Sequence, residues 1–312
     1  MVDLKEMLKA GVHFGHKTSR WSPAMNPYIW GSKNKIHLID VSKTAFLLER
    51  TGKYLQELAK NGGSFLWIGT KKPAQEIIKK TAINLKMPFV VHRWIGGTLS
   101  NFDQIKKAIT KLLYLKEAVN KSTRHYKKKE ISMIQKEVAR LEKNIGGILD
   151  LTYPPAAVIV VDAKKEHSAI REATSLKIPT VALVDTNTDP DGINFVIPAN
   201  DDSPRSINFV IEYLAAQIAE GKKEYDSKKK EAKAITQKTK TESNSQKQVD
   251  KESDDKVSAK KVISKSTTVK EIKAKKPEPK VTAKPTHEEK KDSVKNTKEV
   301  TKTEDKKVST KK

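Results

Sequence analysis

Residues 64–73 read Ser-Phe-Leu-Trp-Ile-Gly-Thr-Lys-Lys-Pro, a short apolar run that ends in a glycine, a threonine and two lysines. The run does not alternate apolar and polar residues, as a strand with one solvent-exposed face would. Pro73 suits the first turn of a helix, which we expect to run to about Lys86. This stretch therefore predicts a strand buried on both faces and followed by a helix.

Similar units follow along the chain. Further apolar runs lie at residues 89–91, 158–161, 181–184 and 195–197, and helices are predicted at about 166–177 and from 203 or 204 to 218. Short strands separated by helices are typical of a parallel sheet covered by helices on both faces. We therefore predict an α/β fold. An earlier helix is expected to start with Ser42 or Thr44 as its N-cap residue.

The first forty residues are predicted from caps and turns. Asp3 and Gly11 are suited to the two ends of a short helix. The segment at 13–36 looks irregular, with many aromatic, proline, asparagine and basic residues. Near the end of this segment, the apolar residues 28–30 and 36–39 flank a polar turn, which predicts a short hairpin.

An insertion at residues 98–146 interrupts the strand and helix pattern. Apolar residues recur there at steps of three and four in two stretches, separated by a Lys- and Arg-rich segment at 120–130. This spacing predicts an α-helical hairpin that pairs as a coiled coil with a basic tip. The hairpin could project from the sheet or lie flat on it. We favour projection, because each apolar stripe is narrow.

The charge is divided between two parts of the chain. The whole sequence has 62 Lys and Arg against 38 Asp and Glu, a net charge of +24. Residues 222–312 hold 29 Lys and 16 acidic residues, with neither Leu nor Gly, so they cannot bury enough apolar surface to offset their chain entropy. We predict a globular domain at 1–221, with a net charge of +11, and a mostly disordered Lys-rich extension at 222–312.

Composition excludes several classes of protein. With no Cys, the chain has no disulfides, thiolate zinc site or cysteine nucleophile. No apolar run is long enough for a membrane-spanning helix, and the acidic N-terminus does not resemble a signal peptide, which favours a cytoplasmic protein. A pI near 9.8 favours a polyanionic partner, most simply nucleic acid, although a general preference for Lys accounts for part of the charge of the extension.

The motifs of nucleotide-binding enzymes are incomplete. Gly69 is a single glycine where a dinucleotide-binding turn needs three, and the phosphate-binding loop pattern is absent. The segment 96–98, Gly-Gly-Thr, could bind an anion, but we favour a tight turn between Trp94 and the helix that follows. A calcium loop aligned on Gly192 fails because its last ligand position is Pro198. No catalytic constellation is identifiable, and we predict neither an enzyme nor a cofactor.

The sequence contains a possible set of metal ligands but does not show that they lie close together. His13 and His16 have the spacing of a two-histidine site but lie on a segment that looks irregular. Oxygen ligands would have to come from Asp185, Asp201 and Asp202, and the sequence does not show that these approach His16. We therefore predict no metal.

Basic residues interleaved with aromatic residues are the clearest functional signal. Lys and Arg bind phosphates, and flat rings stack on unpaired bases. The alternative is that each Trp is packed and each Lys solvated. The candidate RNA-binding residues are Arg20, Trp21, Trp30, Lys33, Lys35, Lys71, Lys72, Arg93 and Trp94.

The same stretches resemble a known family. Residues 7–16, Met-Leu-Lys-Ala-Gly-Val-His-Phe-Gly-His, are similar to the start of the bacterial small-subunit ribosomal protein S2 family. Residues 92–102, His-Arg-Trp-Ile-Gly-Gly-Thr-Leu-Ser-Asn-Phe, resemble its second hallmark, and 178–202 resemble its third. The resemblance covers about residues 1–221 and leaves the extension uncovered.

This resemblance implies a flavodoxin-like sheet with an inserted coiled-coil hairpin. It also implies a structural, non-catalytic protein that binds small-subunit rRNA on the back of the particle. Its partners would be other small-subunit proteins, including the large mRNA-binding ribosomal protein S1 where that protein is present. The two alternatives are a nucleotide-binding α/β enzyme and a free RNA chaperone, neither of which requires assembly into the ribosome.

Overall fold

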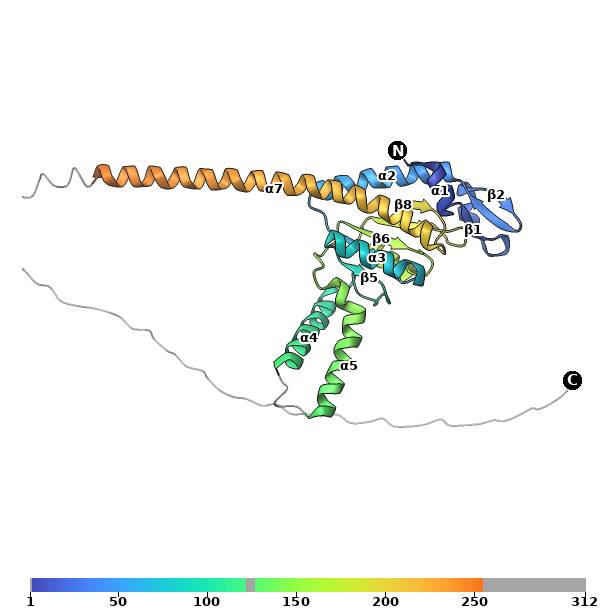
Figure 1. The fold of residues 1–312 in the computed structure, drawn as a ribbon, viewed down its shortest axis with the longest axis horizontal. Coiled ribbons are helices and arrows are strands. Elements are labelled where there is room, and N and C mark those ends of the chain that lie inside the picture. Colours follow the sequence, from blue (N-terminus) through green and yellow to red (C-terminus); the bar gives the residue numbers. More distant parts are fainter. Residues whose placement is uncertain (1, 122–126, 255–312) are drawn as a thin grey trace, which may run out of the picture. The chain divides into compact units, whose positions relative to one another are not determined.

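The computed structural model describes residues 2–121 and 127–254, and the contacts divide the chain near residue 250. The first part is built around a parallel sheet of five strands (Figure 1). The strands are β4 (Phe65–Ile68), β5 (Phe89–Val90), β6 (Ala157–Val161), β7 (Thr180–Val184) and β8 (Phe195–Pro198). Their order is β5-β4-β6-β7-β8, which is the flavodoxin-like order. The predicted α/β fold with a parallel sheet is confirmed.

The sheet separates two apolar cores, and strand β4 shows how. Phe65 and Trp67 point into one core, while Leu66 and Ile68 point into the other, as the period of two of a strand requires. The first core is closed by α2 (Val41–Lys60), α3 (Lys72–Leu85) and α7 (Pro204–Asp254), and the second by α6 (His167–Ser175) and the base of the inserted hairpin. The unalternating run is therefore a strand covered on both faces.

The N-terminal segment forms a second, antiparallel sheet. Helix α1 (Leu4–Ala10) precedes strands β1 (Phe14–Lys17), β2 (Ile29–Lys33) and β3 (Ile36–Ile39), which pair in the order β1-β3-β2. The predicted hairpin is present, whereas the prediction of an irregular segment is wrong at β1. That strand is short and its register with β3 shifts between Phe14 and Lys17, so it has no alternating sequence pattern.

The cap of α2 also differs from the prediction. Asp40 is the N-cap residue, and its carboxylate accepts hydrogen bonds from the backbone of Ser42 and Lys43. Thr44 lies a full turn further on and donates its hydroxyl to the carbonyl of Pro198 at 2.7 Å. Both expected caps are therefore inside the helix.

The insertion contains two helices, α4 (Phe102–Lys121) and α5 (Lys128–Ile145), which contact each other (Figure 1). Two ion pairs link them, Lys111 to Glu137 at 2.6 Å and Lys116 to Glu142 at 2.7 Å. Residues 122–126 of the basic tip lie outside the described part of the chain. Coiled-coil packing and projection of the hairpin remain predictions.

Helix α7 continues into the segment that composition predicts to be disordered. It runs from Pro204 to Asp254, and residues 255–312 lie outside the described part of the chain. Its residues just after Gly221 contact the domain. Lys222 donates to the carbonyl of Leu85 at 2.6 Å, and the ring of Tyr225 lies against Gly62.

In residues 2–121 and 127–254, no helix is both long enough and apolar enough to cross a membrane.

Candidate functional site

The carboxyl ends of the parallel strands bring together polar residues that are far apart in sequence. Lys71 follows β4, Asp162 follows β6, and the Asp201-Asp202 pair follows β8. The Lys71 ammonium lies 2.7 Å from Asp201, 2.6 Å from Asp202 and 3.8 Å from Asp162. Burial lowers the pKa of Lys71, but the hydrogen bonds to the two aspartates outweigh it, so the pKa is raised. Lys71 is therefore the cation of an internal ion-pair network.

His16 joins this network from β1. Its Nδ1 lies 3.0 Å from the buried carboxylate of Asp185, and its Nε2 lies 3.3 Å from Asp202. The Asp185 carboxylate raises the pKa of His16 against the effect of burial. The backbone N–H of His16 also donates to Thr186 at 2.8 Å. These contacts attach the N-terminal sheet to the edge of the parallel sheet.

Four residues of the network could hold a divalent cation. Potential ligand atoms of His16, Asp185, Asp201 and Asp202 all lie within 4.8 Å of one another. His16 Nδ1 and Asp185 Oδ2 are buried and have no hydrogen bond of normal geometry among the described residues. An imidazole with carboxylates suits zinc, and the neighbouring Lys71 ammonium supplies a competing positive charge. The structure thus brings together the four side chains that the sequence could not place, although His13 is not among them.

The crevice that binds ligands in flavodoxin-like folds lies between β4 and β6, where the strand order reverses. Here residues that follow the two strands bond to each other across it. The buried Glu166 accepts a hydrogen bond from Thr70, and Lys165 donates to the carbonyl of Thr70 at 2.9 Å. Burial raises the pKa of Glu166. These internal contacts fit a structural role for this end of the sheet better than a nucleotide site.

The Gly-Gly-Thr turn at 96–98 does bind an anion, but the anion belongs to the chain. Oε1 of Glu172, on α6, accepts hydrogen bonds of 2.9 Å from the backbone of Gly97 and from the indole of Trp94. Its other oxygen accepts hydrogen bonds of 3.0 Å from the backbone of Leu99 and Ser100. The segment is thus the tight turn that the sequence favours. The backbone of this turn also holds an anion, which is the carboxylate of Glu172.

Most of the candidate RNA-binding residues lie on the surface. Trp30 on β2 is 75% exposed and Trp21 is 37% exposed. The exposed cationic candidates come from four segments, and two of them share the β2–β3 hairpin: Arg20, Lys33, Lys35, Lys72 and Arg93. These residues can offer several phosphate contacts and at least one exposed aromatic ring.

Two of the candidates have internal partners instead. Lys71 is held by three aspartates, and Trp94 is buried with its indole bonded to Glu172. Neither side chain is free to contact RNA in this conformation. Glu172 and Asp162 were not anticipated, because no motif marks them and their partners are distant in sequence.

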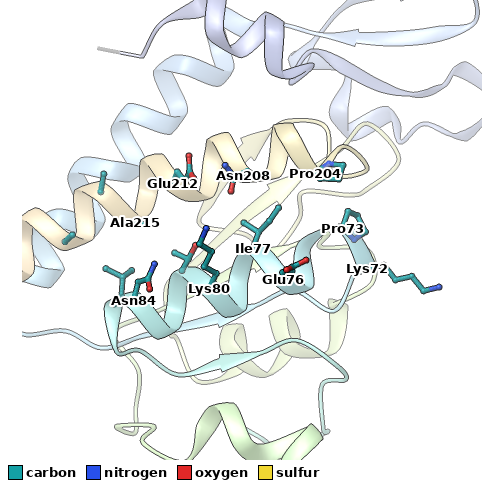
Figure 2. A pocket seen from close by; sticks show the side chains of 14 residues that line it. Lys72, Pro73, Glu76, Ile77, Lys80, Asn84, Pro204, Asn208, Glu212 and Ala215 are labelled. Carbon is teal, nitrogen blue, oxygen red and sulfur yellow. The ribbon is translucent and has the colours of Figure 1, made fainter.

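A groove of about 670 Å³ lies between α3 and α7 (Figure 2). Apolar residues such as Ile77 line it, and its polar rim carries Lys80 and Lys72 together with Glu76 and Glu212. The two positive charges balance the two negative ones. The groove therefore selects no ligand by charge.

Comparison with known proteins agrees with the motifs. Residues 7–221 match the family described as Ribosomal protein S2. The chain is 44% identical over 222 residues to the small ribosomal subunit protein uS2 of Desulfatibacillum aliphaticivorans, covering 71% of this chain and 76% of that protein. It is 42% identical over 226 residues to uS2 of Corynebacterium diphtheriae, covering 72% and 85%. The resemblance is confirmed, and this chain belongs to the ribosomal protein S2 family.

Proposed function

We propose that this protein is a structural constituent of the small ribosomal subunit, where it binds rRNA and neighbouring proteins without catalysing a reaction. Family membership over most of the chain is the observation that carries this function. The site supports it, because Thr70, Lys165 and Glu166 bond to one another at the crevice between β4 and β6.

The cationic surface supports rRNA as the partner. Arg20, Lys33, Lys35, Lys72 and Arg93 are exposed, and they come from four segments of the fold. Contacts from such a surface go mainly to the phosphate backbone, and the deep, narrow major groove of an RNA duplex hides its base edges. Recognition is therefore expected to depend on the shape of the folded RNA rather than on its sequence.

Sedimentation of a cell extract through a sucrose gradient at high salt tests this function. The protein is expected to move with assembled small subunits. A free RNA chaperone would remain mostly at the top of the gradient. Saturable binding of a nucleotide by the protein, with no ribosome association, would instead support an enzyme.

The finer proposals concern the surroundings of the protein. We place it in the cytoplasm with the translating ribosome, and we propose that ribosomal protein S1 docks on it where S1 is present. Exposed apolar side chains on the N-terminal segment, including Phe14 and Trp30, provide a surface that a protein partner could cover. Small subunits that lack this protein should then retain less S1 than complete subunits.

A further inference from the structure

A second cavity lies at the base of the inserted hairpin, apart from the polar network. It has a volume of about 350 Å³ and is formed where α3, the end of β5 and the end of α5 meet. Apolar residues of β5 line it, together with the side chains of Lys79, His92 and Lys143. All three of these side chains are exposed, and each comes from a different segment of the chain. Solvent and ligands can therefore reach the cavity.

The acidic residue that lines this cavity already has a partner of its own. Glu142 is the acidic residue in its lining, and it pairs with Lys116 at 2.7 Å. Among the side chains that the structure describes, those of residues 2–119 and 127–229, no carboxylate lies within ion-pair distance of Lys79 or Lys143. Burial lowers the pKa of His92, and the charges of Lys143 and Lys79 lower it further. Both ammonium groups thus act on one imidazole.

This charge distribution differs from that of the groove between α3 and α7. There, Glu76 and Glu212 balance Lys72 and Lys80. At the base of the hairpin, two lysines face a hollow whose single carboxylate already has a partner. An anion placed there would gain two favourable interactions without displacing an existing ion pair of either lysine.

We propose that the cavity lined by Lys79, His92 and Lys143 binds the phosphate backbone of rRNA. The inference rests on the proposed function, since it names one place where the RNA is held. Lysine binds phosphate as a point charge, and two lysines at one cavity attract the same phosphate group or two successive ones. Such a contact positions the RNA without reading its sequence. It would also fix the base of the hairpin against the RNA.

The test measures binding of the full-length protein to small subunits that lack it, over a range of KCl concentrations. Each phosphate contact contributes about 0.7–0.9 to the slope of log affinity against log salt. The double variant Lys79→Gln/Lys143→Gln is expected to lower that slope by about this amount for each lost contact. Lys79→Arg/Lys143→Arg keeps both charges and is expected to retain the slope of the wild type.

A matched control removes two charges elsewhere. Lys5 and Lys53 are exposed on α1 and α2, so Lys5→Gln/Lys53→Gln changes the net charge equally and is expected to leave the slope unchanged. An unchanged slope in the Lys79 and Lys143 glutamine variant would overturn the inference, as would an equal fall in the control. Failure of the wild type to bind subunits would instead overturn the proposed function.

Discussion

The indole nitrogen of Trp94 donates a hydrogen bond of 2.9 Å to Glu172, a residue 78 positions later in the chain. The same carboxylate accepts hydrogen bonds from the backbone of Gly97, Leu99 and Ser100. These bonds attach α6, which covers the sheet, to the turn that leads into the inserted hairpin. One side chain therefore fixes the base of the hairpin to the domain.

Replacement of Glu172 by Ala is expected to destabilise the protein by about 2–3 kcal/mol, because it leaves the buried donors of Trp94 and Leu99 without an acceptor. Glu172→Gln should cost less, since an amide oxygen can still accept some of these bonds. Urea unfolding of the full-length protein measures both. The exposed Glu57→Gln is a control, expected to change stability by less than about 0.5 kcal/mol. Similar stability in all three variants would show that Glu172 does not hold the turn.

The contribution of Glu172 should depend on pH. Burial would raise the pKa of this carboxyl, but the hydrogen bonds from Ser100, Trp94, Gly97 and Leu99 outweigh it, so the pKa lies below the ordinary value of 4.5. The folded protein then binds the proton less readily than the unfolded chain does. Stability from this group is therefore present above pH 4.5 and is lost as the pH falls through the folded pKa.

The pH dependence can be measured as the difference in unfolding free energy between the wild type and Glu172→Gln. That difference should be constant near neutral pH and should shrink at acidic pH, below 4.5. A difference that grows on acidification would contradict the assigned direction of the shift.

Lys71 should be essential for folding stability, whereas its neighbour Lys72 should not. Removal of Lys71 leaves Asp201, which is 1% exposed, without its ammonium partner. Burial and the charge of Asp185 raise the pKa of Asp201 to about 7, so this carboxyl can take up a proton when Lys71 is lost. The expected cost is therefore less than the roughly 3–5 kcal/mol of a fully charged buried pair, but well above that of a surface substitution. Lys72 is exposed, so Lys72→Ala is expected to change stability by less than about 0.5 kcal/mol. Chemical denaturation of Lys71→Ala and Lys72→Ala compares them directly. Adding Asp201→Asn to Lys71→Ala should recover part of the loss, and no recovery would place the loss elsewhere.

The parallel sheet could be predicted because its signals are local. Runs such as 158–161 are continuously apolar, and helices follow them directly, so no knowledge of distant contacts was needed. Strand β1 could not be found in this way. Its partner β3 lies about twenty residues later, and the shift at Phe14 and Lys17 removes the alternation that would mark a strand.

Only the part of the candidate site that follows the strands of the parallel sheet could be predicted from the sequence. Residues that follow parallel strands meet at one edge, which explains why Lys71 and Asp201 approach each other. The ring of His16 reaches the same edge from β1, a strand of the second sheet. The sequence did not indicate that the two sheets meet there. Glu172 lies on a helix with no motif around it. Its role depends on the placement of a turn that precedes it by about seventy residues.

The start of the C-terminal extension should contribute to stability, while its later part should not. Just after Gly221, Lys222 bonds to Leu85 and Glu224 pairs with Lys60 at 3.1 Å. A methyl group at Gly62 would lie 2.7 Å from the ring of Tyr225, so the two residues are closely packed.

A chain that ends at residue 235 is therefore expected to melt at the temperature of the full-length protein. A chain that ends at residue 221 loses the contacts of Lys222, Glu224 and Tyr225. Loss of the half-buried Tyr225 ring alone is expected to cost about 1–2 kcal/mol. For a domain of this size, each kcal/mol of lost stability lowers the melting temperature by about 2–4 °C.

Tyr225→Ala in the full-length protein should lower the melting temperature less than truncation at residue 221 does. Equal melting temperatures for the chains that end at 221 and 235 would show that residues 222–235 make no stabilising contact. A lower melting temperature for the chain that ends at 235 than for the full-length protein would show that residues beyond 235 also stabilise the domain.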